Sequence, residues 1–235
     1  MTPNLADHLL VLTLAGVLPA FGWITYQKLI ADVRAGDPDA RLDEYRRTTL
    51  TEWALVAVTL IVWLDAARPL AALGFDVPTD LRTLLGGVTT ALGLAFLALQ
   101  WLQVRNGDDV LHEQFRAAYA GATDLMPRTP SEQRGAQVLS ITAGICEEVL
   151  YRGFLIAYVA TFTGNAWTAA AIAAAAFGLA HSYQGRSGIL KTTIVGLVAG
   201  ALYVATGSLL WPIVLHVAVD LQATAIARVV LPARA

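Results

Sequence analysis

Seven long apolar stretches divide the chain and constrain its fold more than any other feature of the sequence. They lie at about 7–30, 50–67, 83–104, 136–161, 166–183, 189–206 and 209–230. A helix needs roughly 20 mainly apolar residues to cross about 30 Å of hydrocarbon, and these stretches approach or reach that length. With 56% hydrophobic and 14% charged residues, the chain is far more apolar than a water-soluble domain needs. We therefore predict an all-α, polytopic transmembrane helical bundle with about seven spans.

Short sequence signals for helix starts accompany several of these stretches. Serine, threonine and asparagine can accept a hydrogen bond from the first free backbone N–H groups of a helix, and a glutamate three residues later completes a capping box. Such signals occur at Thr49 with Glu52, at Thr129 with Glu132, at Asn165 and at Ser208.

The two longest polar segments, 31–48 and 105–135, are expected to be cytoplasmic loops, because they are too polar to span a membrane. Within the second, Leu111, Phe115 and Tyr119 repeat at helical spacing. The pattern predicts a helix that either lies in the membrane interface or packs on the bundle.

Lysine and arginine cluster at alternate connections along the chain, which predicts its orientation because positive charge stays in the cytoplasm. The N-terminus is predicted outside and the C-terminus inside. The first stretch lacks the basic start and cleavage site of a signal peptide, so it is expected to remain as a span. Abundant arginine and alanine suggest a prokaryotic cytoplasmic membrane. A net charge of −2 and the lack of a basic stripe argue against nucleic-acid binding.

Ionisable side chains gather within the later spans, where each costs roughly 2.5–3.5 kcal/mol on insertion scales unless it faces protein or water. They are Glu147, Glu148 and Arg152 in the fourth stretch, His181 at the end of the fifth, and His216 and Asp220 in the seventh. The first three stretches hold few comparable groups, so the later spans are predicted to enclose a polar site.

Helical spacing assigns partners within this cluster. Glu148 and Arg152 are four residues apart and share a helix face, so they can neutralise each other. Glu147 points about 100° away and is left without that partner, which makes it a candidate base. His216 and Asp220 are also four apart, so the carboxylate can orient the imidazole.

Three motifs in these spans resemble the CAAX prenyl endopeptidase and bacteriocin-processing family of intramembrane proteases, also called the CPBP or Abi family. Residues 147–153 resemble its EExxxRG signature, residues 177–181 its FxxxH motif, and residues 216–220 its final HxxxN/D element. The resemblance covers roughly 129–231. It suggests N-terminal spans and loops over 1–128 and a catalytic helical core over 129–235, within one membrane domain.

The resemblance implies hydrolysis of a peptide bond near the cytosolic face of the membrane. Glu147 and His181 would activate a water, and His216 with Asp220 would stabilise the oxyanion. Glu148 and Arg152 would brace the helix, and Phe177 would pack beside His181. The partners would be membrane lipids and a peptide or protein substrate, with or without a lipid attached.

Several alternatives stay open at this point. Many family members have asparagine where this chain has Asp220, so Asp220 could instead orient His216 or join Glu147, His181 and His216 in a zinc site. Cys146 could act as a nucleophile. His181 and His216 also differ in expected depth by several ångströms. A non-catalytic scaffold and a proton-coupled transporter are the alternative functions, since both use intramembrane charges.

Overall fold

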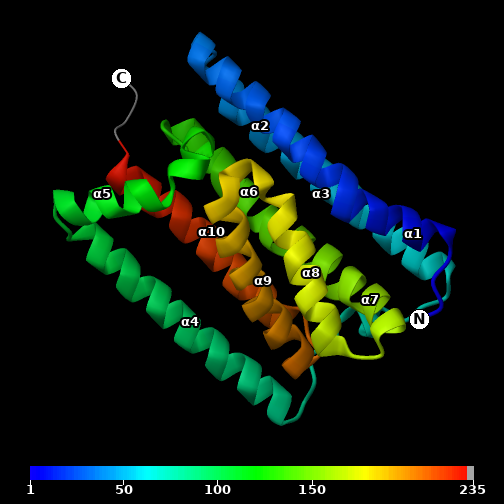
Figure 1. Ribbon diagram of the computed structural model, residues 1–235. Coiled ribbons are helices and arrows are strands. Elements are labelled where there is room, and N and C mark those ends of the chain that lie inside the picture. The colour runs from blue at the N-terminus through cyan, green and yellow to red at the C-terminus, as the bar shows by residue number, and fades with distance from the viewer. Residues whose placement is uncertain (232–235) are drawn as a thin grey trace.

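The computed structural model describes residues 1–231, which form a bundle of helices (Figure 1). The helices are α1 Leu5–Leu12, α2 Leu18–Ala35, α3 Ala40–Asp65, α4 Leu81–Arg105, α5 Asp109–Ala118, α6 Pro130–Glu147, α7 Ile156–Thr163, α8 Ala166–Ala180, α9 Gly185–Thr206 and α10 Leu210–Val230. No strand occurs among the described residues, so the predicted all-α fold is confirmed.

Two of the long helices are continued through a π-helical turn. Thr13–Val17 joins α1 to α2, and Glu148–Leu155 joins α6 to α7. Short 3-10 turns at Leu70–Leu73, Ala120–Leu125 and Ser182–Gln184 connect other elements. The polar part of the fourth apolar stretch therefore lies inside a continuous helix with a locally widened turn.

Five helices are long and apolar enough to cross a membrane: Leu5–Ala35, Ala40–Asp65, Leu81–Arg105, Ser182–Thr206 and Leu210–Val230. The other two predicted spans differ from these. The α6–α7 helix carries the buried charges, and α8 is an apolar helix of only 15 residues. At 1.5 Å per residue α8 is about 22 Å long, less than the hydrocarbon thickness. The membrane bundle is thus present, while the count of seven spans stays a prediction.

The predicted loop over 31–48 was wrong. The helix α2 continues to Ala35 and ends at Gly36, whose φ of 85° suits a residue without a side chain. The next helix begins at Ala40. Ion pairs between residues three apart, Asp43 with Arg46 and Glu44 with Arg47, satisfy the charges along one helix and allow it to extend beyond its apolar part.

Two of the four predicted caps are confirmed as N-caps. Thr129 and Glu132 form a capping box at the start of α6, and the Asn165 side chain accepts from the first N–H groups of α8. The Thr49 cap was wrong, because it lies inside α3. The prediction for Ser208 was one residue early: the N-cap of α10 is Leu209, and Ser208 Oγ accepts from the N–H of Leu210 at 3.3 Å.

The helix predicted within 105–135 is present as α5. Its Phe115 and the following Tyr119 pack against an apolar cluster of Val104, Ile226 and Val230, which joins the ends of α4 and α10. The helix α5 therefore packs on the bundle at the end where the described chain finishes (Figure 1).

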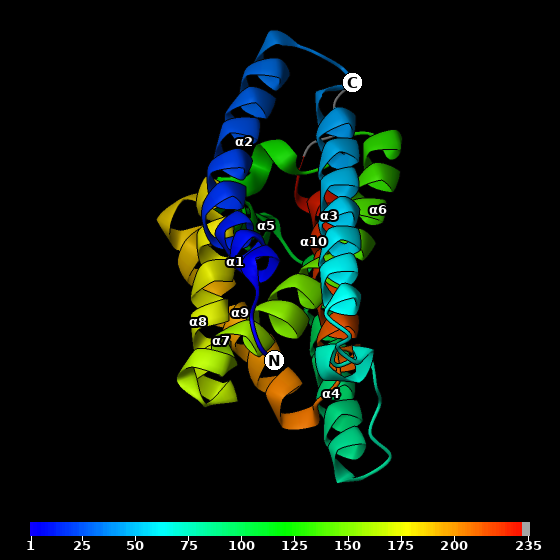
Figure 2. The same ribbon diagram turned by 90° about the vertical axis from the view of Figure 1, so that its right-hand side faces the viewer.

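The view in Figure 2 shows the helices arranged in two groups. In one, α8 packs closely on α9, because Gly196 faces Ala174 and Gly200 faces Ala170 across the helix contact. In the other, α10 packs against both α6 and α4, and α3 packs against α6. The π turn Glu148–Leu155 contributes to the apolar core that connects the groups.

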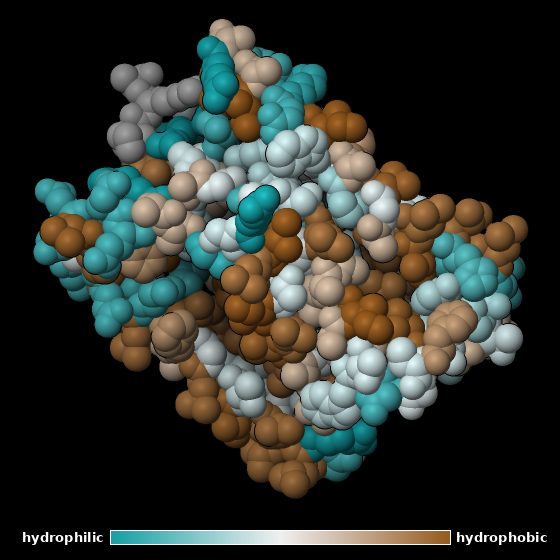
Figure 3. Space-filling view, viewed as in Figure 1, coloured by the Kyte–Doolittle hydropathy of each residue, from teal (hydrophilic) through white to brown (hydrophobic). Residues whose placement is uncertain are grey.

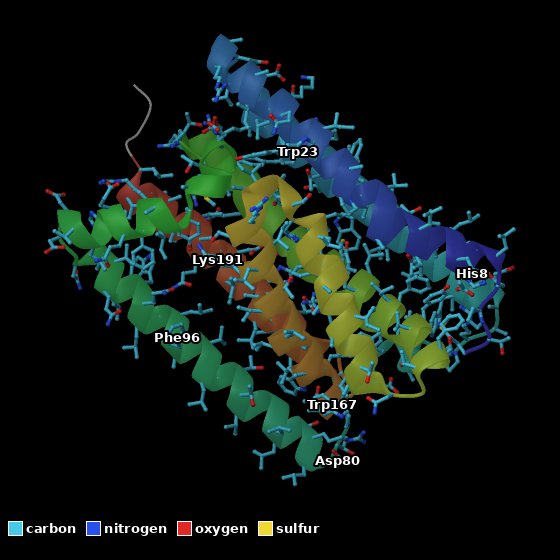
Figure 4. The ribbon with its side chains drawn as sticks, viewed as in Figure 1. His8, Trp23, Asp80, Phe96, Trp167 and Lys191 are labelled. Atoms are coloured by element: carbon cyan, nitrogen blue, oxygen red, sulfur yellow. The ribbon has the colours of Figure 1, made fainter. Side chains whose placement is uncertain are left out.

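Apolar side chains also cover the outside of the bundle (Figure 3). On α4, Leu92 and Phe96 are 67% and 63% exposed, and Figure 4 shows Phe96 pointing away from the other helices. Hydrophilic side chains gather around α5 at one end of the same face (Figure 3). This distribution fits a protein whose middle contacts lipid and whose ends contact water.

Candidate active site

The two adjacent glutamates lie where α6 passes into the π turn Glu148–Leu155. All eight residues of this turn are buried. Gly153 within it has no room for a side chain, because an added Cβ would lie 2.9 Å from the Leu73 carbonyl oxygen. The Glu148 side chain is completely buried, whereas that of Glu147 is 17% exposed. The turn therefore seals one carboxylate inside the bundle and leaves the other accessible.

Glu147 lies between two histidines from different helices. Its Oε1 is 4.0 Å from Nε2 of His181, and its Oε2 is 3.6 Å from Nε2 of His216. These separations are too long for direct hydrogen bonds. They are short enough for one water, placed beside the line between the groups, to contact a carboxylate oxygen and an imidazole together.

Glu148 connects its predicted partner to the second histidine. Its Oε1 accepts from Arg152 Nη1 at 2.7 Å and lies 2.7 Å from Nδ1 of His216. The predicted Glu148–Arg152 pair is thus present. The hydrogen bond between Glu148 and His216 could not be predicted from helical spacing, because 68 residues separate them in the sequence. By accepting from Nδ1–H, Glu148 turns the other ring nitrogen of His216 toward Glu147.

His181 is oriented by its own helix. Its Nδ1 lies 2.9 Å from the backbone oxygen of Phe177, to which Nδ1–H can donate a hydrogen bond. The Phe177 ring packs against the His181 ring with centroids 4.6 Å apart, as predicted. The guanidinium of Arg152 lies on that phenyl ring, 4.4 Å from its centroid. His181 therefore presents Nε2, with a free electron pair in this tautomer, to Glu147.

Asp220 faces the same histidine from one turn further along α10. Its Oδ2 is 3.8 Å from Nε2 of His216, and its side chain is 35% exposed. The short hydrogen bond that orients His216 is made by Glu148 and not by Asp220. Asp220 is therefore the most accessible of the three carboxylates beside this imidazole, which are those of Glu147, Glu148 and Asp220.

These residues line a cavity of about 460 Å³ with mainly apolar walls. Its walls come from α2, α3, α6, α8, α9 and α10, and Tyr119, which follows α5, also lines it. Burial raises the pKa of the Tyr119 phenol, and the Asp220 carboxylate adds to the effect. Tyr119 therefore stays neutral and can donate a hydrogen bond beside the polar part of the cavity.

The expected difference in depth does not keep the two histidines from sharing one site. Both approach Glu147 within 4.0 Å. The helix α8 has only 15 residues and ends just before His181, whose side chain is 15% exposed. A full-length span would have carried His181 toward the membrane surface.

The sequence prediction missed Glu52, which also lines this cavity. Its Oε2 is buried and has no hydrogen-bond partner. A glutamate within an apolar span is the same signal that identified Glu147, but the nearby Thr49 suggested a helix cap instead. The neighbouring Trp53 donates to Thr142 at 3.3 Å and ties α3 to α6 beside the site.

The predicted zinc ligands are Glu147, His181, His216 and Asp220. Among residues 1–231, no group of three or more histidine, cysteine, aspartate or glutamate side chains is arranged to hold a metal ion. The ring of His216 uses Nδ1 for Glu148 and offers only Nε2. Cys146 is completely buried and does not line the cavity. The reactive groups of the predicted site that line the cavity are therefore carboxylates and imidazoles, and the thiol is not among them.

Comparison with known proteins agrees with the motifs. The family model of type II CAAX prenyl endopeptidase, Rce1-like, matches residues 135–222. No curated protein and no solved structure matches the chain. The matched segment includes Glu147, His181, His216 and Asp220, which the fold brings to one cavity. Over residues 135–222 the chain is thus similar to the Rce1-like type II CAAX prenyl endopeptidases.

Proposed function

We propose that the protein is an intramembrane endopeptidase in which Glu147 and His181 activate a water for attack on a peptide bond. The observation that supports this most strongly is the position of the Glu147 carboxylate inside the bundle. Each of its oxygens faces a ring nitrogen of a different histidine, within a cavity large enough to admit an extended peptide segment. A scaffold would have no need to keep these groups accessible.

Glu147 acts as the general base. A water beside Glu147 and His181 loses a proton to the carboxylate while its oxygen attacks the carbonyl carbon. His181 assists because its Nδ1 is held by Phe177, which leaves Nε2 as an acceptor for the second hydrogen of the water. The attack forms a tetrahedral intermediate with a negative charge on the former carbonyl oxygen.

His216 and Asp220 lie where that oxygen can be bound. Three carboxylates surround His216, those of Glu147, Glu148 and Asp220. They favour an imidazolium, whose Nε2–H can donate to the oxyanion. Glu148 and Arg152 act as positioning residues, because Glu148 holds the ring of His216 and Arg152 holds Glu148.

The substrate is proposed to be a peptide or protein that reaches the cavity from the membrane. The apolar walls suit side chains or an attached lipid, and the bundle is surrounded by membrane lipids. We place the site toward the cytosol, with the N-terminus outside and the C-terminus inside, because Arg105, Arg116 and Arg128 lie at the end of the bundle that carries α5. The resemblance to the family adds support for this orientation.

The decisive experiment measures cleavage of lipidated and unlipidated peptides by the purified protein in detergent. Glu147→Gln is expected to lower kcat/KM by roughly 10²- to 10⁴-fold, because it removes the general base and keeps the side-chain shape. Glu113→Gln is the matched control, since Glu113 is exposed on α5 and does not line the cavity. It should cleave as the wild type does.

Cleavage that survives Glu147→Gln contradicts the mechanism. A strong chelator is added in parallel, and activity that persists in it supports carboxylate–imidazole chemistry. Activity that the chelator removes and zinc restores would show a metal-dependent reaction instead. If no peptide is cleaved but sealed vesicles that contain the protein move protons, the transporter replaces the protease.

A further inference from the structure

A second carboxyl group, Glu52 on α3, lines the cavity that contains Glu147. It reaches the cavity from a helix outside the segment that matches the family. Its Oε2 is sealed from solvent and has no hydrogen-bond partner. The charges that act on Glu52 are those of Glu147 and Asp220, both negative, and the more weakly acting His216.

Other buried acids of the described chain have firm partners. Asp7 binds Arg68, Glu132 binds Arg41, and Glu148 binds both Arg152 and His216. A buried carboxylate that lacks such partners is costly. The position of Glu52 beside other carboxylates therefore calls for a chemical explanation.

The three carboxyl groups of the cavity, those of Glu52, Glu147 and Asp220, differ in their partners. Two carboxylates that share an apolar site cannot both be ionised at low cost, so a proton settles on one of them. Glu147 has imidazoles within 4.0 Å of both its oxygens, and Asp220 has His216 at 3.8 Å. The sealed oxygen of Glu52 has neither an imidazole nor any other hydrogen-bond partner. Among the three carboxyl groups, Glu52 is the one least able to hold a negative charge.

We infer that Glu52 is a second catalytic carboxyl group, which holds a proton and gives it to the leaving nitrogen of the cleaved bond. The inference rests on the proposed function. It extends the site beyond the matched segment and gives Glu147 and Glu52 opposite roles, base and acid.

The proton balance closes over one reaction cycle. In the first step, the water oxygen bonds to the carbonyl carbon, and its proton passes to Glu147. In the second, the carbon–nitrogen bond breaks, its electron pair stays on nitrogen, and Glu52 protonates that nitrogen while the carbonyl reforms. The products are a carboxylic acid and an amine. The proton on Glu147 then returns to Glu52 through water in the cavity, which restores the starting state.

The test compares two substrates with the same acyl part, one a peptide amide and the other a p-nitrophenyl ester. The amide needs a proton on its leaving nitrogen, whereas p-nitrophenolate leaves without one. Glu52→Gln should lower kcat for the amide by roughly 100-fold and leave kcat for the ester within about threefold. Glu147→Gln should lower both. Asp65→Asn, which neutralises an exposed carboxylate at the end of the same helix, should lower neither.

Equal losses for amide and ester in Glu52→Gln would overturn the inference, since a structural defect affects both substrates. Full activity on both would overturn it as well. In either case, an activity that disappears in Glu147→Gln leaves the proposed function intact. If the wild type cleaves neither substrate while correctly folded, the donor role fails together with the proposed function.

The location of the proton can also be measured without a substrate. The infrared difference spectrum of wild type minus Glu52→Gln at neutral pH should contain the C=O stretch of a protonated carboxylic acid. Carboxylate bands in its place would overturn the inference. Gln resembles the protonated side chain in shape and charge, so this variant should unfold at the temperature of the wild type.

Discussion

Two buried carboxylate–arginine pairs in the molecule have the same chemistry and different surroundings. Near the N-terminus, both oxygens of Asp7 accept from Arg68, each at 2.7 Å. The backbone N–H of Asn4 also donates to Asp7. In the site, Glu148 offers one oxygen to both Arg152 and His216, and its other oxygen is buried without a partner.

This difference in hydrogen bonding suggests that the Asp7–Arg68 pair has a structural role and that the Glu148–Arg152 pair also serves the catalytic site. In the first pair, the arginine donates two parallel hydrogen bonds, one to each carboxylate oxygen of Asp7. It fixes the start of α1 to the segment after α3, where Arg68 also lies on the Trp63 ring. In the second, an unsatisfied buried oxygen costs free energy. Such a cost is retained where the carboxylate also directs a reactive group, here the imidazole of His216.

Of the two pairs, the one in the site is expected to have the larger effect on cleavage when its carboxylate, that of Glu148, is neutralised. Glu148→Gln removes the charge that orients His216 and favours its protonated form, so kcat/KM should fall by roughly 10²-fold or more. Cleavage is measured per folded molecule, with folding followed by a thiol-reactive dye that labels the buried Cys146 only after unfolding.

The double variant Glu148→Gln with Arg152→Gln separates the two roles of Glu148. It removes the unpaired buried arginine and should regain stability while staying inactive, because His216 still lacks its carboxylate. A folded Glu148→Gln protein with full activity would place this pair in the same structural class as Asp7–Arg68.

A smaller effect is expected from helix contacts that set the distance between Glu147 and His216. Gly144 on α6 packs on α10, and a Cβ there would lie 2.8 Å from the backbone nitrogen of Val217. Gly144→Ala should push the helices apart and lower kcat/KM by about tenfold, since small displacements of reacting groups slow the reaction. Gly16→Ala in the N-terminal helix is the control, because its Cβ would meet only Leu12 at 3.6 Å. Equal activity of the two variants would contradict the role of this contact.

Spacing along single helices predicted much of the site. The four-residue separations of Glu148 from Arg152 and of His216 from Asp220 placed each pair on one face, and the structure has both pairs. The expected solitary position of Glu147 is also present, in that it faces histidines and not Arg152. Local helix geometry carries this information, so one sequence suffices to obtain it.

Contacts between different helices could not be predicted from residue spacing within one helix. The bond from His216 to Glu148 and the approach of Glu52 to the cavity depend on how α3, α6 and α10 pack. The extent of α3 was missed for another reason: charged residues after Ala40 were interpreted as a loop, but they form ion pairs along a helix. Polarity alone does not distinguish these two structures.

The smallest effect on cleavage is expected at the N-terminal pair. Asp7→Asn removes charged hydrogen bonds to Arg68 and should lower the free energy of unfolding by about 2 kcal/mol. The folded protein should still cleave within about twofold of the wild-type rate, because Asp7 lies outside the cavity. The unfolding temperature is read from labelling of Cys146, and Asp7→Asn with Arg68→Gln should recover part of the loss. A large drop in kcat at unchanged stability would show that the two pairs are coupled through the bundle, and the distinction between them would fail.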